Sequence, residues 1–219
     1  GELRTPGTLQ TRSMGGVGVG MRNAAAVNLL NPAAYSAVRP KSFLFDFGLE
    51  GQCFYNSQKY YGQTLNTSYY TVNFHDIAFQ LPIAKHLGLG FSLTPYSSVG
   101  YEQSDDVWGN IGRVQYQWDG DGDVTEVKLG LGWEIFRGFS IGIAAQYYWG
   151  DIQRIYKTAI LENITGGGLI ADATGTETYS VSRFKGQFGV QWSPISNRRR
   201  ILTIGATYDI GGDLNPNVT

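Results

Sequence analysis

The residues able to do chemistry are few, and their spacing limits what each group could do. The glycine-rich run GGVGVG at residues 15–20 is close to a dinucleotide-binding pattern. That pattern needs glycines at 16, 18 and 21 after a strand, but residue 21 is Met21 and no strand precedes the run. The run therefore predicts close backbone packing and no bound nucleotide, and we expect no cofactor.

The acidic run DGDGD at residues 119–123 suggests a calcium loop. Val124 and Gly130 occupy the positions where an EF-hand needs glycine and glutamate, which excludes that motif. Two interpretations remain: an exposed acidic hairpin tip, or a weak divalent-ion site at the outer surface.

His75 and Asp76, with serines on the next strand, could be parts of a hydrolase triad. Neighbouring strand residues point to opposite faces, so we expect that Asp76 cannot orient His75, and no nucleophile elbow is present. Cys53 is the chain's one cysteine, and with two histidines it cannot build a common zinc site. We predict no catalytic residues, no metal site and no enzymatic activity.

Composition narrows the classes of partner. Glycine makes up 30 of 219 residues, charged residues only 16% and aromatic residues 14%. Soluble domains average about 25% charged residues, so this surface must be covered by a partner or a membrane. The net charge of −1 excludes the basic surface of a nucleic-acid binder. No stretch is long and apolar enough for a membrane-spanning helix, which leaves a β-barrel as the membrane option.

Hydrophobic residues alternate with small or polar residues from residue 42 onward, which predicts β-strands. In one strand the apolar face is formed by Val127, Leu129, Leu131, Trp133 and Ile135, and the other face by Lys128, Gly130, Gly132 and Glu134. A soluble sandwich also alternates, but a face of Gly, Ser and Gln is typical of a crowded barrel lumen. We therefore predict an all-β, transmembrane antiparallel β-barrel in the bacterial outer membrane, in contact with lipid. A serine at Gly130 should then cost little stability.

The connections predict the orientation. Strands are expected at 42–53, 69–83, 87–103, 123–136, 139–157, 178–194 and 200–211. The connections alternate between short turns and long loops. The short turns are expected at 84–87, 137–138 and 196–200, and the last contains Arg198, Arg199 and Arg200. The long loops are expected near 54–68, 104–122 and 158–177. Outer-membrane barrels have short periplasmic turns and long outer loops. Seven is an odd number of strands, which indicates that residues 42–219 are an N-terminal part of a larger barrel, preceded by a separate segment over residues 1–41.

Tyrosine pairs at residues 60–61, 69–70 and 147–148 suit the aromatic girdles of a barrel or, alternatively, stacking on a ligand. In the N-terminal segment, a short helical stretch is expected near residues 23–30. Because the residue before a proline avoids helical conformation, Asn31-Pro32 is expected to end that stretch.

The run RSMGGVGVGMRNAAAVNLLNPAAYSAV at residues 12–38, followed by SFLFDFGLEGQ, resembles the start of the outer-membrane transporters of hydrophobic compounds typified by FadL and TodX. Ala34 after the Asn-Pro-Ala motif is most similar to members from Bacteroidetes. The resemblance covers about the first fifty residues. It implies a fourteen-stranded barrel, of which about seven strands are present, with residues 1–41 as a hatch inside it. The implied hatch residues are Gly15, Gly16, Gly18, Gly20, Asn31, Pro32 and Ala33.

The resemblance implies uptake of a fatty-acid-like hydrophobic ligand, with lateral exit through an opening in the third strand. Pro95 stands in that strand and cannot donate a ladder hydrogen bond. Pro95 and Tyr96 therefore mark either the wall opening or a local bulge filled by side chains. Two other functions stay open: a non-transporting accessory protein of a secretion machine, with a protein partner at the outer loops, and a purely structural barrel.

Overall fold

The computed structural model describes residues 2–60, 62–109, 112–163, 173–196, 200–214 and 216–218. The elements are β1 (Glu2–Leu3), α1 (Leu9–Ser13), the 3-10 helix η1 (Pro32–Ala37), β2 (Leu44–Tyr60), β3 (Gln63–Ala84), β4 (Leu87–Gly109), β5 (Gly112–Phe136), β6 (Phe139–Asn163), β7 (Ala173–Ser196), β8 (Ile201–Ile210) and β9 (Asn217–Val218). Two short helical elements, α1 and η1, precede the seven longer strands β2 to β8, and the two-residue strands β1 and β9 lie near the ends of the chain.

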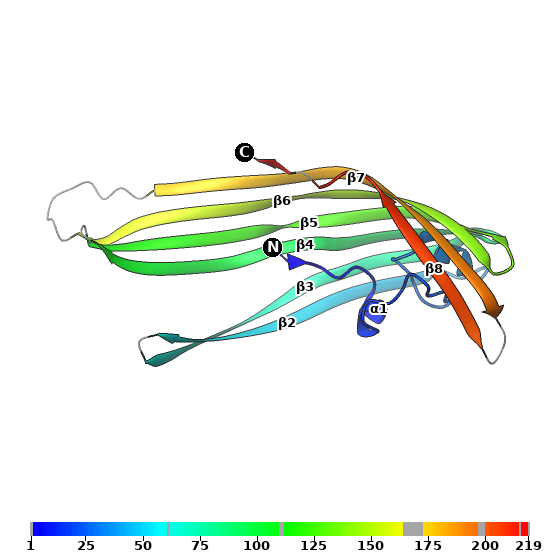
Figure 1. Ribbon diagram of the computed structural model, residues 1–219, viewed down its shortest axis with the longest axis horizontal. Helices are drawn as coiled ribbons and strands as arrows, with labels where there is room; N and C mark the ends of the chain where they lie inside the picture. Colours follow the sequence, from blue (N-terminus) through cyan, green and yellow to red (C-terminus); the bar gives the residue numbers. More distant parts are fainter. Residues whose placement is uncertain are drawn as a thin grey trace.

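The strands form one curved antiparallel sheet in the order β2-β3-β4-β5-β6-β7-β8 (Figure 1). The short β1 pairs with β4, and the short β9 pairs with β7. The predicted all-β antiparallel class is confirmed. Among the described residues β2 and β8 end the sheet without pairing to each other, so closure into a barrel stays a prediction. The described helices are too short or too polar to span a membrane.

The two faces of the sheet differ as the alternation predicts. On β5, Leu129 and Trp133 are about half exposed, at 50% and 51%, whereas Lys128 between them is only 6% exposed. Each strand thus turns apolar side chains outward and small or polar side chains to the inner face, which carries the N-terminal segment. Apolar side chains that are half exposed on this outward face, among them Leu49, Trp133 and Trp192, form a surface that water disfavours.

Two of the three predicted long loops, near 54–68 and 104–122, are wrong. The third, near 158–177, lies partly outside the described residues. Residues 54–60, 63–68 and 104–109 continue strands, and the DGDGD run lies within β5 rather than at a hairpin tip. Polar and charged residues dominate these strand halves, and the apolar alternation left in them is short, as at Val114, Tyr116 and Trp118 of β5. Arg198 and Arg199 lie outside the described residues.

The N-terminal segment follows the inner face between β1 and the start of β2. The expected helical stretch at residues 23–30 is absent: those residues form turns, and the helical turn follows them as η1. Asn31 is the N-cap of η1 and accepts a hydrogen bond from the amide of Ala33, and Pro32 is the first helical residue. Proline favours a first helical position because no amide hydrogen bond is needed there, so the Asn-Pro pair begins a helix here instead of ending one.

Candidate functional site

Glycines on the inner face form a lane that receives η1. The members of this glycine lane are Gly88, Gly90, Gly130, Gly132, Gly142 and Gly189. A Cβ atom on Gly142 would overlap the backbone of Pro32 and Ala33, and one on Gly88 would overlap the Tyr35 carbonyl group. The Tyr35 side chain is 1% exposed in this lane. The glycines therefore set how closely the segment and the sheet approach each other.

The lane corrects one expectation. A Cβ on Gly130 would lie 2.8 Å from the Ala144 Cβ and 2.9 Å from Cε2 of Tyr35. A serine at Gly130 therefore has no room, and the prediction that it costs little stability is wrong. The alternation places Gly130 on the inner face, but it does not show that the Tyr35 ring packs over this glycine.

The segment is also held by hydrogen bonds from buried amide and ammonium groups of the sheet. Gln80 Nε2 donates to the Asn28 carbonyl at 2.9 Å, Lys128 Nζ donates to the Leu29 carbonyl at 3.0 Å, and Gln191 Nε2 donates to the Val19 carbonyl at 2.9 Å. Buried polar groups are costly unless they are hydrogen-bonded. The polar residues of the inner face are thus matched to the backbone of the N-terminal segment. The sequence analysis did not single out these three side chains.

The residues expected to form a hatch divide into two groups. Asn31, Pro32 and Ala33 meet at the glycine lane, where Asn31 Nδ2 donates to the carbonyls of Val19 at 2.8 Å and Val190 at 3.1 Å. The glycines of the run lie elsewhere. Gly18 packs on Leu30, Gly20 packs on the β8 backbone, and Gly15 and Gly16 form a turn with positive φ after α1. A hatch function for these residues stays a prediction.

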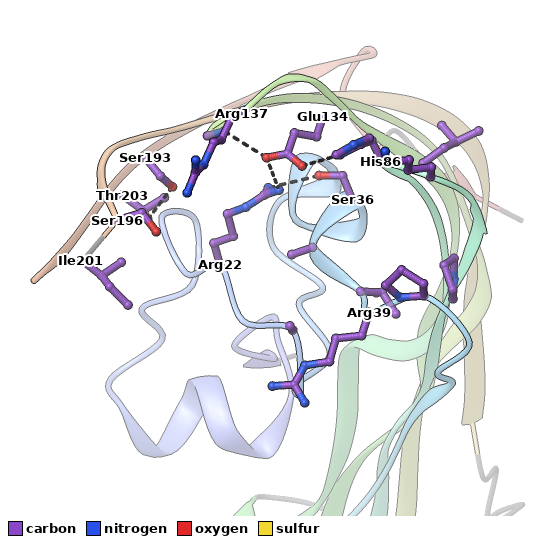
Figure 2. A pocket seen from close by; sticks show the side chains of 18 of the residues that line it. Arg22, Ser36, Arg39, His86, Glu134, Arg137, Ser193, Ser196, Ile201 and Thr203 are labelled. Atoms are coloured by element: carbon purple, nitrogen blue, oxygen red, sulfur yellow. Dashed lines mark hydrogen bonds and ion pairs between the residues drawn. The ribbon is translucent and has the colours of Figure 1, made fainter. Parts of the chain in front are cut away.

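Docking of the segment brings Arg22 to the end of the sheet that carries the short turns. Arg22 Nη1 donates to the hydroxyls of Ser140 at 2.8 Å and Ser36 at 3.1 Å, and Nη2 lies 3.5 Å from Oε1 of Glu134. Figure 2 shows Arg22 reaching from the segment toward Glu134, with Ser36 beside it. Arg22 thereby joins the segment, β5 and β6 at one point.

Glu134 also holds the two hairpin turns on either side of it. Its Oε2 is 2.8 Å from Nδ1 of His86 in the β3–β4 turn, and its Oε1 accepts from the amide of Gly138 at 3.0 Å in the β5–β6 turn. His86 has φ +67°, a left-handed conformation that is uncommon for a residue other than glycine. The Glu134 backbone amide donates to the His86 carbonyl at 2.8 Å, so this conformation is supported from two sides.

A cavity of about 830 Å³ opens beside this cluster. Its ionisable lining is basic apart from Glu134: Arg22, Arg39, Lys85, His86 and Arg137. Within the described ranges, Arg39, Lys85 and Arg137 take part in no side-chain ion pair. Figure 2 shows Arg39 and Arg137 on opposite sides of the cavity. We call this the basic pocket. Two arginines and a lysine around one opening can bind a carboxylate or phosphate through charge-assisted hydrogen bonds.

A second charged cluster ties the start of the segment to β2. Glu50 accepts from Arg4 Nη1 at 3.1 Å and from Arg12 Nη1 at 2.9 Å. Gln52 Nε2 donates to the other carboxylate oxygen of Glu50 at 3.1 Å. One carboxylate thus holds both arginines of the segment.

His75 and Asp76 do not obey the expected strand alternation, and that prediction is wrong. The β2–β3 register shifts between Gly48, opposite Asp76, and Leu49, opposite Phe74, so His75 is an extra residue in β3. A β-bulge of this kind puts both side chains on the inner face, where His75 Nδ1 contacts Oδ1 of Asp76. Among the described residues no hydrogen bond joins His75 to a serine, so the pair lacks a hydrogen-bonded nucleophile.

Pro95 and Tyr96 lie at a second bulge. The β4–β5 ladder continues past them with Pro95 opposite Thr125 and Ser97 opposite Val124, so Tyr96 is the extra residue. On its other side, the pairing of β4 with β3 ends at Leu93 and Ile77, just before Pro95. The structure thus contains a bulge toward β5 and a separation from β3. Lateral exit of a ligand at this position stays untested.

The family model of BamG matches residues 1–219. No curated protein and no solved structure matches the chain. The predicted FadL/TodX relationship is therefore wrong. The residues that suggested it, the glycine run and Asn31-Pro32-Ala33, belong to a segment that packs on a β-sheet, and packing of this kind does not identify a transporter.

Proposed function

Because this chain belongs to the BamG family, we propose that it is an accessory protein of the BAM complex at the bacterial outer membrane, acting by binding and without catalysis. The observation that carries the proposal is the family match over residues 1–219. This function corresponds to the accessory-protein alternative, with a protein as the main partner.

The outward face of the sheet supports placement in a membrane. Near the short-turn end every long strand carries alternate apolar residues for about nine residues, as in residues 127–135 of β5 and 184–192 of β7. Nine to eleven residues of a tilted strand cross the hydrocarbon core of a bilayer. Phe188 and Trp192 on β7 are 48% and 49% exposed, which suits contact with lipid.

The other half of the sheet supports contact with proteins. β5 and β6 have 25 residues each, which at about 3.3 Å per residue is roughly 80 Å, far more than the ~30 Å of hydrocarbon. The remaining strand halves are richer in polar and charged residues and would project beyond the bilayer. A projecting sheet of this size offers a partner both a surface and strand edges.

The basic pocket at the short-turn end supplies a second contact. Its cations are spaced around an opening large enough for several side chains. Among the described residues of its lining the one acid, Glu134, is already bonded to Arg22, His86 and Gly138. We propose that it binds a carboxylate-bearing segment of a BAM subunit. Short turns face the periplasm in outer-membrane barrels, so this contact would be periplasmic.

Affinity purification of the tagged, full-length protein from its own outer membrane tests the proposal. We expect BAM subunits to co-purify in constant ratio through a second purification step. The double variant Arg39→Glu with Arg137→Glu should lower the recovered BAM subunits at least tenfold at low salt, because charge reversal repels an acidic segment.

The matched control reverses two cations outside the basic pocket, Lys59→Glu with Arg183→Glu, and should leave recovery unchanged. If both double variants reduce recovery equally, the basic pocket is not the contact. Absence of BAM subunits from the unmodified preparation would reject the proposed function itself.

A further inference from the structure

The sheet is split between β3 and β4 over half of its height. The two strands pair from Ala84 opposite Leu87 to Ile77 opposite Leu93, and in the described part of the chain no pair joins them farther on. Both strands nevertheless continue: residues 63–76 stay paired with β2, and residues 94–109 stay paired with β5. Figure 1 shows the β2–β3 hairpin bending away from β4 and β5. Two strand edges therefore face each other across the split.

The split begins where each strand carries a bulge. His75 is the extra residue of β3 and Tyr96 is the extra residue of β4, directly beyond the last β3–β4 pair. A bulge bends its strand and increases its twist. Pro95 has no amide hydrogen to donate, which further disfavours a continuous ladder at this height. The local sequence of both strands thus produces the separation.

The edge of β4 already accepts a strand. Glu2 and Leu3 of β1 pair antiparallel with Ser98 and Ser97, and the Arg4 amide donates to the Tyr96 carbonyl at 2.9 Å. This pairing is only two residues long. Beyond it, the β4 edge over residues 99–109 and the β3 edge over residues 63–76 have no strand partner on the split side among the described residues.

A groove of about 630 Å³ lies along the split. Its walls come from both sides: Gln52, Phe54, Tyr69, Thr71 and Asn73 from β2 and β3, and Ser98, Val99, Gly100, Tyr101 and Asp121 from β4 and β5. The lining is mostly uncharged and mixes aromatic rings with amide and hydroxyl groups. Arg4, at its base, is held by Glu50 and Ser98. Such a lining suits a peptide backbone with alternating polar and apolar side chains.

We propose that this groove is a strand-addition site, in which an extended segment of a BAM subunit pairs antiparallel with β4 and continues the short β1 pairing. The proposal rests on the proposed function for the identity of the partner. Backbone hydrogen bonds to an unpaired edge supply affinity, and alternate side chains supply specificity. Strand pairing also explains how the exposed edge avoids nonspecific association, because an occupied edge is no longer a template.

Photo-cross-linking along β4 tests the site in the intact complex. A photoreactive amino acid is placed singly at Val99, Tyr101 and Gln103, and the cross-linked peptides are identified by mass spectrometry. We expect all three probes to reach one segment of one BAM subunit. Each two-residue step along β4 should move the partner contact two residues in the opposite direction, because antiparallel pairing has that register. A control probe at Thr176 on β7, three strands away from β4, should not reach this segment.

Other outcomes overturn the proposal. Cross-links to a second copy of this chain, cross-links without a register, or no cross-link in a complex that still contains all BAM subunits would exclude strand addition by a BAM subunit while leaving the proposed function intact. If BAM subunits do not co-purify with the unmodified protein, the proposed function fails, and this inference fails with it. A small-molecule ligand would give the no-cross-link result.

Discussion

Arg4 and Glu50, 46 residues apart in sequence, connect the N-terminal segment to β2 through a 3.1 Å hydrogen bond from Nη1 to Oε2. Arg4 also donates through its backbone to Tyr96 and through Nη2 to Ser98 on β4. One residue thereby spans the split between the β2–β3 hairpin and β4. Glu50 binds Arg12 as well, so loss of this carboxylate should release the whole start of the segment.

Glu50→Gln should loosen the N-terminal segment without unfolding the sheet. Charge-assisted hydrogen bonds of this kind contribute about 1.5–3 kcal/mol, so cleavage near Arg12 by trypsin should accelerate about tenfold or more. Limited proteolysis followed by mass spectrometry measures the rate. Asp106→Asn removes the acid of the Arg113–Asp106 pair on the remote β4–β5 hairpin and serves as the control. Equal acceleration in the control would mean that Glu50 has no particular role.

Gly142→Ala should displace η1 from the glycine lane. The added Cβ would overlap the backbone of Pro32 and Ala33, which cannot rotate away as a side chain can, and overpacking of this kind costs about 1–3 kcal/mol. Gly100→Ala is the matched control, because a Cβ at Gly100 meets no atom within 4 Å. Thermal unfolding of both variants in detergent gives the comparison. We expect a lower Tm for Gly142→Ala alone, and equal Tm values would show that the lane is not tightly packed.

Leu131→Arg should destabilise the protein in a bilayer by about 2–4 kcal/mol, since the side chain points outward in the apolar half of β5. Gln153→Arg, outward on the polar half of β6, should cost less than about 0.5 kcal/mol. Reversible folding into lipid vesicles measures both values. Similar losses at the two positions would argue against a membrane around residues 127–135.

Strand periodicity and the two faces of the sheet could be predicted from the sequence, because they depend on neighbours two residues apart. Leu129 and Lys128 show this directly, with one half exposed and the other buried, as their alternation predicts. The ends of the strands could not be predicted in this way. Polar and charged residues dominate the far halves of β4 and β5, so residues 104–122 were predicted to be a loop although the two strands pair along their whole length.

The candidate sites depended on contacts that no local pattern contains. His75 and Asp76 share a face only because β2 and β3 pair with a one-residue shift, and that shift is a property of two strands together. The basic pocket exists because Arg22 is carried to Glu134, 112 residues farther along the chain, by the fit of Tyr35 and Pro32 to glycines on four strands. Alternation determined which residues could face inward. Which of these inward-facing residues come together was decided by the tertiary structure. The N-terminal segment packs on the glycines of the sheet with backbone against backbone, and this packing brings distant residues to one place.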